Sequence, residues 1–267
     1  MRQSIVGVPR TCVRFTSTST PIARHQSKPL DAVKIFPSEL VSSPSKGMGI
    51  RELPTSPKRE QSQGEEIANA VSHGIGLAAM LVGTPILITH STRDGNAGFI
   101  VGVSIFCATA ILLYLGSTLY HAFPIGKAKR AFRVIEHSAI FLLIAGTYTP
   151  FTLGVLRGAW GWTLLGVIWT LAAAGVVLKT FEKSPHPIVS TSLYLFMGWA
   201  VVIAIDPLIS RMPTAGLVWM IAGGVSYTVG VAFFATDSCL KYGHLIWHLF
   251  VLTGTACHYF AVLWYAG

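Results

Sequence analysis

The last apolar segment of the sequence opens with two histidines, His244 and His248, that are four residues apart. On a helix, this spacing places both imidazoles on one face, about one turn apart. Residues 249–266 contain no Asp, Glu, Lys or Arg, as is typical of a membrane span. Ionisable groups in such spans are uncommon and usually face a bundle interior or a cavity. Alone, the pair predicts either a functional site or two interfacial histidines at a helix end.

Three further polar residues lie at the ends of other apolar segments. Ser117 and His121 close one segment and share a helical face, and Glu136 opens the next. Imidazole suits zinc, and a catalytic zinc typically has three protein ligands and one water. Each residue also has an ordinary explanation: His121 could stabilise a helix C-terminus, and Glu136 could pair with Arg130 or Arg133. The elements that carry these residues decide between the two interpretations.

The composition is that of an integral membrane protein. Hydrophobic residues make up 52% of the 267 residues and charged residues only 12%, whereas a soluble domain carries about 25% charged residues. The net charge is +9, but half of the 20 Lys and Arg lie in residues 1–64 and most others lie between apolar runs. The charge therefore does not indicate a nucleic-acid partner, and no feature indicates a protein partner.

Residues 65–267 contain seven apolar segments, each near the ~20 residues that a helix needs to cross ~30 Å of hydrocarbon. We predict an all-α membrane protein, a seven-transmembrane helix bundle in which short connections make successive helices neighbours. Gly98-x-x-x-Gly102 predicts a close helix contact, and Pro85, Pro150 and Pro207 are expected to kink or end spans. The predicted spans are 68–89, 99–120, 134–154, 160–178, 188–209, 214–235 and 245–265.

The charges between the spans predict the orientation. The connections on one side carry seven basic residues, and those on the other side carry three. The positive-inside rule then places the N-terminus in the cytosol, or in the matrix or stroma of an organelle, and the C-terminus on the other side. The two sets are Lys127, Lys129, Arg130, Arg133, Lys179, Lys183 and Lys241 against Arg93, Arg157 and Arg211.

This topology brings the unusual polar residues to one depth. His121, Glu136, His244 and His248 all lie at the cytosolic ends of three different helices, which predicts a metal site, with zinc as the best-fitting ion. Ser117 is predicted to hold a ligand, the water or a substrate group.

Three further polar residues lie in the spans or their connections: His73, Asp237 and His258. His73 and Asp237 belong to the same half of the bundle and are candidates for orienting the ligands or lining a substrate channel. His258 lies fourteen residues beyond His244, about 21 Å along a helix, so we expect it to make a hydrogen bond in the core instead.

Residues 1–64 form a separate region, rich in Pro, Ser, Thr, Lys and Arg, that is expected to be disordered or weakly ordered. The first 30 residues hold five basic residues and no acidic ones. This composition is typical of an organellar transit peptide, the mitochondrion being the expected destination. The alternative is a cytosolic basic tail near anionic lipid.

The motifs of residues 65–267 resemble those of the haemolysin III family, within the progestin and adipoQ receptor superfamily that includes the adiponectin receptors. The similar motifs are Glu65-Glu66-Ile67-Ala68-Asn69-Ala70-Val71-Ser72-His73-Gly74, Ser117-x-x-x-His121, Glu136-His137-Ser138-Ala139-Ile140-Phe141, Ala145-Gly146-Thr147-Tyr148-Thr149-Pro150-Phe151 and His244-x-x-x-His248.

The resemblance implies a zinc ion near the cytosolic face, with His121, His244 and His248 as ligands and Ser117 close by. The corresponding carboxylate in the family is often Asp and holds the zinc-bound water; here it is Glu136, whose extra methylene could bring it to the metal directly. The superfamily also resembles membrane ceramidases, and its members are linked to ceramide hydrolysis or to hormone and lipid sensing.

Three classes of function follow. The first is a zinc-dependent hydrolase of a lipid amide similar to ceramide, with a membrane lipid as substrate. In this hydrolase the catalytic residues are Glu136, as the base, and Ser117, which orients the substrate or the oxyanion. The second is a lipid or hormone sensor in which zinc is structural. The third is a transporter or zinc-handling protein, although charges inside the spans are too sparse to trace an ion path. An open position at the metal favours the first class, and a closed four-ligand site favours the second.

Overall fold

The computed structural model describes residues 59–93, 96–181 and 187–267, apart from the side chain of Pro187. Every regular element within these ranges is a helix, and seven segments are long and apolar enough to cross a membrane. The chain is therefore a multi-pass integral membrane protein, as its composition predicts. The predicted disordered tail, residues 1–64, lies outside the described ranges up to residue 58. The predicted targeting segment, residues 1–30, lies wholly outside them.

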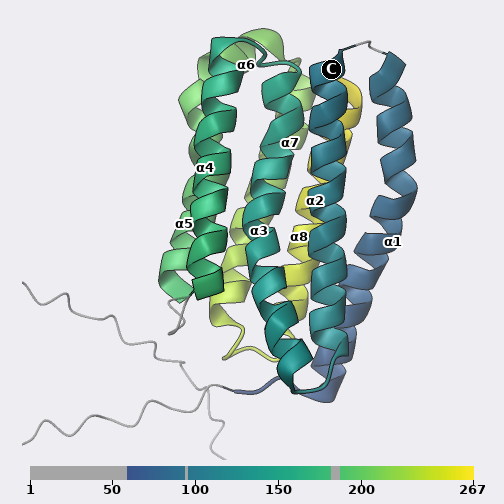
Figure 1. The fold of residues 1–267 in the computed structure, drawn as a ribbon, viewed down its shortest axis with the longest axis vertical. Coiled ribbons are helices and arrows are strands. Elements are labelled where there is room, and N and C mark those ends of the chain that lie inside the picture. Colours follow the sequence, from purple (N-terminus) through teal and green to yellow (C-terminus); the bar gives the residue numbers. More distant parts are fainter. Residues whose placement is uncertain (1–58, 94–95, 182–186) are drawn as a thin grey trace, which may run out of the picture. The chain divides into compact units, whose positions relative to one another are not determined.

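The helices follow one another in an antiparallel bundle (Figure 1). A short 3₁₀ helix, η1, interrupts the fifth span, so that α5, η1 and α6 together form the candidate span Ile188–Arg211. The elements are α1 (Gln63–Arg93), α2 (Ala97–Ala122), α3 (Lys127–Leu153), α4 (Ala159–Phe181), α5 (Pro187–Trp199), η1 (Ala200–Ala204), α6 (Ile205–Arg211), α7 (Thr214–Thr236) and α8 (Gly243–Tyr265).

All seven predicted spans are present, but α1 and α3 begin earlier than predicted. Helix α3 begins at Lys127 rather than at residue 134, because its basic first two turns are still helical although too polar for a hydrocarbon span. Helix α1 begins at Gln63 rather than at residue 68 and carries Glu65 and Glu66 in its first turn. Negative side chains are favourable there because the N-terminus of a helix is electropositive.

The predicted close helix contact is present at Gly102. A Cβ atom at this position would lie only 2.7 Å from Cα of Pro150, so the backbones of α2 and α3 approach more closely than a side chain would allow. Pro85 and Pro150 lie inside α1 and α3 and do not end them at once. Pro207 lies in the first turn of α6, where its missing N–H costs little.

The alternating direction of the helices gathers particular helix ends at one end of the bundle. The N-termini of α1, α3 and α8 and the C-terminus of α2 all lie at the lower end of Figure 1, and Gly267 follows α8 at the other end. Helix α1 packs against α2 and α8, and α3 packs against α2. Polar residues near these four termini are therefore brought together from distant parts of the sequence.

We predict that accessible tags placed before residue 59 and at Gly267 will be found on opposite sides of the membrane, because seven spans separate them. The positive-inside rule assigns the first tag to the cytosol or the matrix. Protease protection of sealed vesicles measures both sides. Two tags on the same side would require an even number of spans.

Candidate metal centre

The structure brings His121, Glu136, His244 and His248 together at the lower end of the bundle. Each residue offers one ligand atom, and these four atoms all lie within 4.8 Å of one another. All four residues are buried, and His248 is completely inaccessible. They come from three helices: α2 near its C-terminus, and α3 and α8 near their N-termini. These three termini lie at the same end of the bundle (Figure 1). This buried cluster could hold a metal ion.

The chemistry of the donor atoms fits a metal. The Nε2 atoms of His121, His244 and His248 are buried and have no hydrogen-bond partner among the described residues. Leaving a buried polar atom unpaired costs about 1–3 kcal/mol, so a cluster with three such atoms is unfavourable without a shared partner. A cation that accepts three imidazole lone pairs would satisfy all of them at once.

The other ring nitrogen of His121 is held by a carboxylate of α1. Its Nδ1 lies 2.8 Å from Oε2 of Glu66, and because a carboxylate can only accept, the Nδ1–H donates. Glu66 is itself held by Lys129, whose Nζ lies 2.9 Å from the same oxygen. The hydrogen on Nδ1 leaves the lone pair on Nε2, which points into the cluster. A carboxylate of this kind fixes the orientation of a metal-binding histidine and increases its basicity.

Helix α1 holds His248 in a similar way. The Nδ1 of His248 lies 3.0 Å from Oγ of Ser72 and 3.3 Å from the carbonyl oxygen of Asn69. Since Ser72 donates its own hydrogen to Asn69 O at 2.8 Å, its oxygen accepts from His248. The Nε2 of His248 is again the unprotonated nitrogen.

Asp237 lies beside the third histidine. Its Oδ2 is 3.4 Å from Nδ1 of His244, which is longer than an ordinary hydrogen bond but close enough for electrostatic attraction. The prediction that Asp237 orients a ligand is consistent with this position.

Glu136 and Ser117 form a second part of the cluster. The Oγ atom of Ser117 donates to Oε1 of Glu136 at 2.6 Å, and the serine is completely buried. The same carboxylate oxygen lies 3.6 Å from Nε2 of His121. The sequence predicts that Ser117 holds a ligand, the water or a substrate group. In this structure its hydroxyl holds the carboxylate of Glu136. The carboxylate is thus oriented by Ser117 and directed toward the imidazoles.

His73 lies next to the cluster without joining it. Its ring stacks on His248 with ring centroids 3.5 Å apart and an interplanar angle of 6°. Tyr114 packs edge-on against the same ring. Neither nitrogen of His73 has a hydrogen-bond partner among the described residues. The ring therefore fixes the plane of His248 and forms part of a cavity wall.

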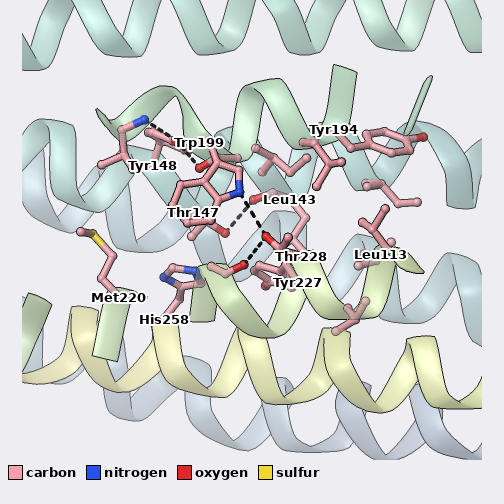
Figure 2. Close-up of a pocket in the computed structure, with 18 of the residues that line it drawn as sticks. Leu113, Leu143, Thr147, Tyr148, Tyr194, Trp199, Met220, Tyr227, Thr228 and His258 are labelled. Atoms are coloured by element: carbon pink, nitrogen blue, oxygen red, sulfur yellow. Dashed lines mark hydrogen bonds between the residues drawn. The ribbon is translucent and has the colours of Figure 1, made fainter. Parts of the chain in front are cut away.

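A cavity begins at this cluster and continues through the bundle. Figure 2 shows part of its lining, including Tyr194, Met220 and His258. Glu136, His244 and His73 line one part of the cavity, and His258 lines another. The cavity has a volume of about 160 Å³. The walls between are mostly aliphatic and aromatic side chains of α3, α5, α7 and α8, so the cavity suits an apolar chain.

Hydrogen bonds of Glu65 join the start of α1 to Arg59 and to the loop before His244. Both terminal nitrogens of Arg59 bind the carboxylate of Glu65, at 2.8 and 2.7 Å, and this hydrogen bonding raises the pKa of Arg59. Glu65 also accepts the backbone N–H of Tyr242 at 2.8 Å. Tyr242 has a φ of 59°, which non-glycine residues rarely adopt, so this bond helps to hold a strained residue just before α8.

Glu66, Asn69 and Ser72 of α1 are contact residues that the motifs did not identify. These residues are spaced three apart on α1, so they form a polar stripe along one helical face. The sequence shows this spacing, but it does not show that the stripe contacts His121 and His248.

Comparison with known proteins supports the family suggested by the motifs. The family model described as "Haemolysin-III related" matches residues 61–259. Hemolysin-3 of Bacillus cereus is 46% identical over 201 residues, which cover 75% of this chain and 91% of the relative. The Hemolysin-3 homolog of Bacillus subtilis (strain 168) is 44% identical over 201 residues, covering 75% and 94%.

A more distant relative is the monocyte to macrophage differentiation factor of Homo sapiens, 29% identical over 209 residues, covering 74% of this chain and 83% of the relative. The match to the family model covers the whole helical bundle except its last turns. The chain belongs to the haemolysin III-related family.

Proposed function

We propose that this protein is a zinc-dependent hydrolase that cleaves an amide bond of a membrane lipid similar to ceramide. The proposal rests on one observation: an apolar cavity begins at a buried cluster of three histidines and a carboxylate. The cluster offers metal chemistry, and the cavity offers room for a lipid chain beside it.

Each member of the cluster has a distinct role in this proposal. His121, His244 and His248 hold zinc through Nε2. A bound zinc ion would supply a Lewis acid and lower the pKa of a water molecule toward ~7. Glu136 accepts the proton of the attacking water and passes it to the leaving amine. Ser117 holds the carboxylate through its hydrogen bond to Oε1, so that Oε2, which lies 3.6 Å from Nδ1 of His137, is the oxygen that takes the proton.

A sensor with a structural zinc is the second candidate, and one observation favours it. The carboxylate of Glu136 lies within the same 4.8 Å as the three imidazole nitrogens, so it can serve as a fourth ligand. Four protein ligands close a zinc site and leave no position for a reacting water. The two functions thus differ in whether Glu136 binds the metal or activates water.

We also propose that the end of the bundle with the cluster faces the cytosol, or the matrix if residues 1–30 direct the chain to the mitochondrion. The basic connections at this end and the acid-free composition of the first 30 residues support this placement. Residues 1–64 fused to a soluble reporter should carry it to the organelle. A reporter that stays diffuse in the cytosol would exclude the mitochondrial part.

We predict that His248→Ala will lose most of the zinc found in the purified protein, because two imidazoles cannot replace three ligands. Glu66→Gln should weaken zinc affinity roughly 10- to 100-fold while leaving all ligands in place, since it removes the carboxylate that orients His121. Elemental analysis and chelator competition measure both effects.

His90→Ala is the matched control, because His90 lies in the last turn of α1, at the other end of the bundle. Its zinc content should equal that of the wild type. If His248→Ala also retained full zinc, the assignment of the ligands would be wrong.

We predict that Glu136→Gln will lower lipid amide hydrolysis by ~10²–10⁴, the usual contribution of general acid–base catalysis. The amide side chain can still accept the hydrogen bond from Ser117 but cannot take a proton. Release of fatty acid from a ceramide-like lipid, followed by mass spectrometry, measures the rate.

Zinc content of the same variant separates the two functions. Glu136→Gln with zinc retained and hydrolysis lost supports the hydrolase. Loss of zinc identifies Glu136 as a ligand and favours the sensor. Unchanged hydrolysis would contradict the mechanism.

A further inference from the structure

His258 lies in α8 ten residues beyond His248, about 15 Å along the helix. The side chain is 7% exposed, and its Nδ1 has no hydrogen-bond partner in the described part of the chain. The core hydrogen bond expected from the sequence is therefore absent there. A buried imidazole nitrogen without a partner is costly in the interior of a membrane protein, so a ligand that supplies one is favoured there.

The surroundings of His258 hold its ring in one position. Tyr227 stacks on it with ring centroids 5.6 Å apart and an interplanar angle of 18°, and Phe151 packs edge-on at 6.5 Å. A Cβ atom at Gly223 would lie 2.6 Å from Nε2 of His258, so a glycine on α7 is what makes room for the imidazole. These contacts form a shaped site around a polar ring.

The hydroxyl of the stacked Tyr227 ring already has a hydrogen-bond partner. Tyr227 Oη and Thr255 Oγ1 are 2.9 Å apart and hydrogen-bond to each other. Tyr227 therefore contacts His258 through its ring, while its hydroxyl pairs with Thr255.

The position of His258 in the cavity indicates what its partner is. The same cavity is lined by Glu136 and His244 at the candidate metal centre, and by His258 with Met220 and Tyr227 farther along the bundle (Figure 2). Between them the walls are mostly apolar. A lipid whose head lies at the metal centre would pass along these mostly apolar walls before its chain reached the imidazole of His258.

We propose that His258 forms a second polar subsite, which hydrogen-bonds a hydroxyl group carried by a lipid chain about 15 Å from the metal centre. A hydroxyl group both donates and accepts, so it pairs with either neutral form of imidazole. The ligand class is therefore a long-chain lipid oxygenated far from its head group. This inference rests on the proposed function only in placing the lipid head at the metal centre.

The test uses the zinc-loaded full chain in lipid nanodiscs and measures displacement of a fluorescent fatty acid. The competitors are ω-hydroxy fatty acids of increasing chain length, each paired with its unsubstituted parent. At one chain length the hydroxy acid should bind roughly 3- to 10-fold more tightly than its parent, the value of one hydrogen bond. No preference at any chain length would overturn the proposal.

Variants then assign the preference to His258. His258→Phe keeps a ring but removes both nitrogens, so the preference should disappear while the parent acid still binds. Thr253→Val is the control, because Thr253 lies on the exposed side of α8, and it should keep the preference. A preference that persists in His258→Phe would overturn the assignment.

If His258→Phe fails to bind the parent acid, His258→Met takes its place, since a flexible methionine fills a similar space without a donor. The outcome for hydrolysis is separate. A His258-dependent preference without amide hydrolysis would overturn the proposed function and leave the subsite intact. Hydrolysis without the preference would overturn the subsite alone.

Discussion

Inside a bundle of membrane helices, three buried histidines of one cluster each have an Nε2 atom with no hydrogen-bond partner among the described residues. In apolar surroundings each unpaired nitrogen is unfavourable, and a shared cation is the partner that removes all three penalties together. The opposite nitrogens of His121 and His248 are held by Glu66 and Ser72 of α1. Helix α1 offers no atom to the ligand cluster, yet it determines which nitrogen of two histidines remains free.

The same helix connects the cluster to the rest of the fold. Glu65 and Glu66 are neighbours in sequence but act in different directions: Glu66 holds a histidine of α2, and Glu65 holds Arg59 and the loop before α8. The first turn of α1 thus fixes the relative positions of the two helices that carry the histidines. Displacing this turn would disturb the cluster without altering any candidate ligand.

Seven spans and the convergence of His121, Glu136, His244 and His248 could be predicted because both follow from composition and from helices that alternate in direction. The roles of Glu66 and Ser72 could not, since they depend on how α1 is rotated against α2 and α8. The start of α3 at Lys127 was missed because hydropathy marks only the apolar part of a helix. The spacing placed His258 far from the cluster, but the cavity that joins them depends on side chains from many helices.

We propose that this cluster holds zinc through nitrogen ligands. X-ray absorption at the zinc edge of the purified protein tests it most directly, because it reports both the metal and the atoms around it. We expect nitrogen or oxygen neighbours at about 2.0–2.1 Å, with the scattering pattern of three imidazole rings. Zinc surrounded by sulfur at about 2.3 Å, or protein that binds no zinc, would contradict the account.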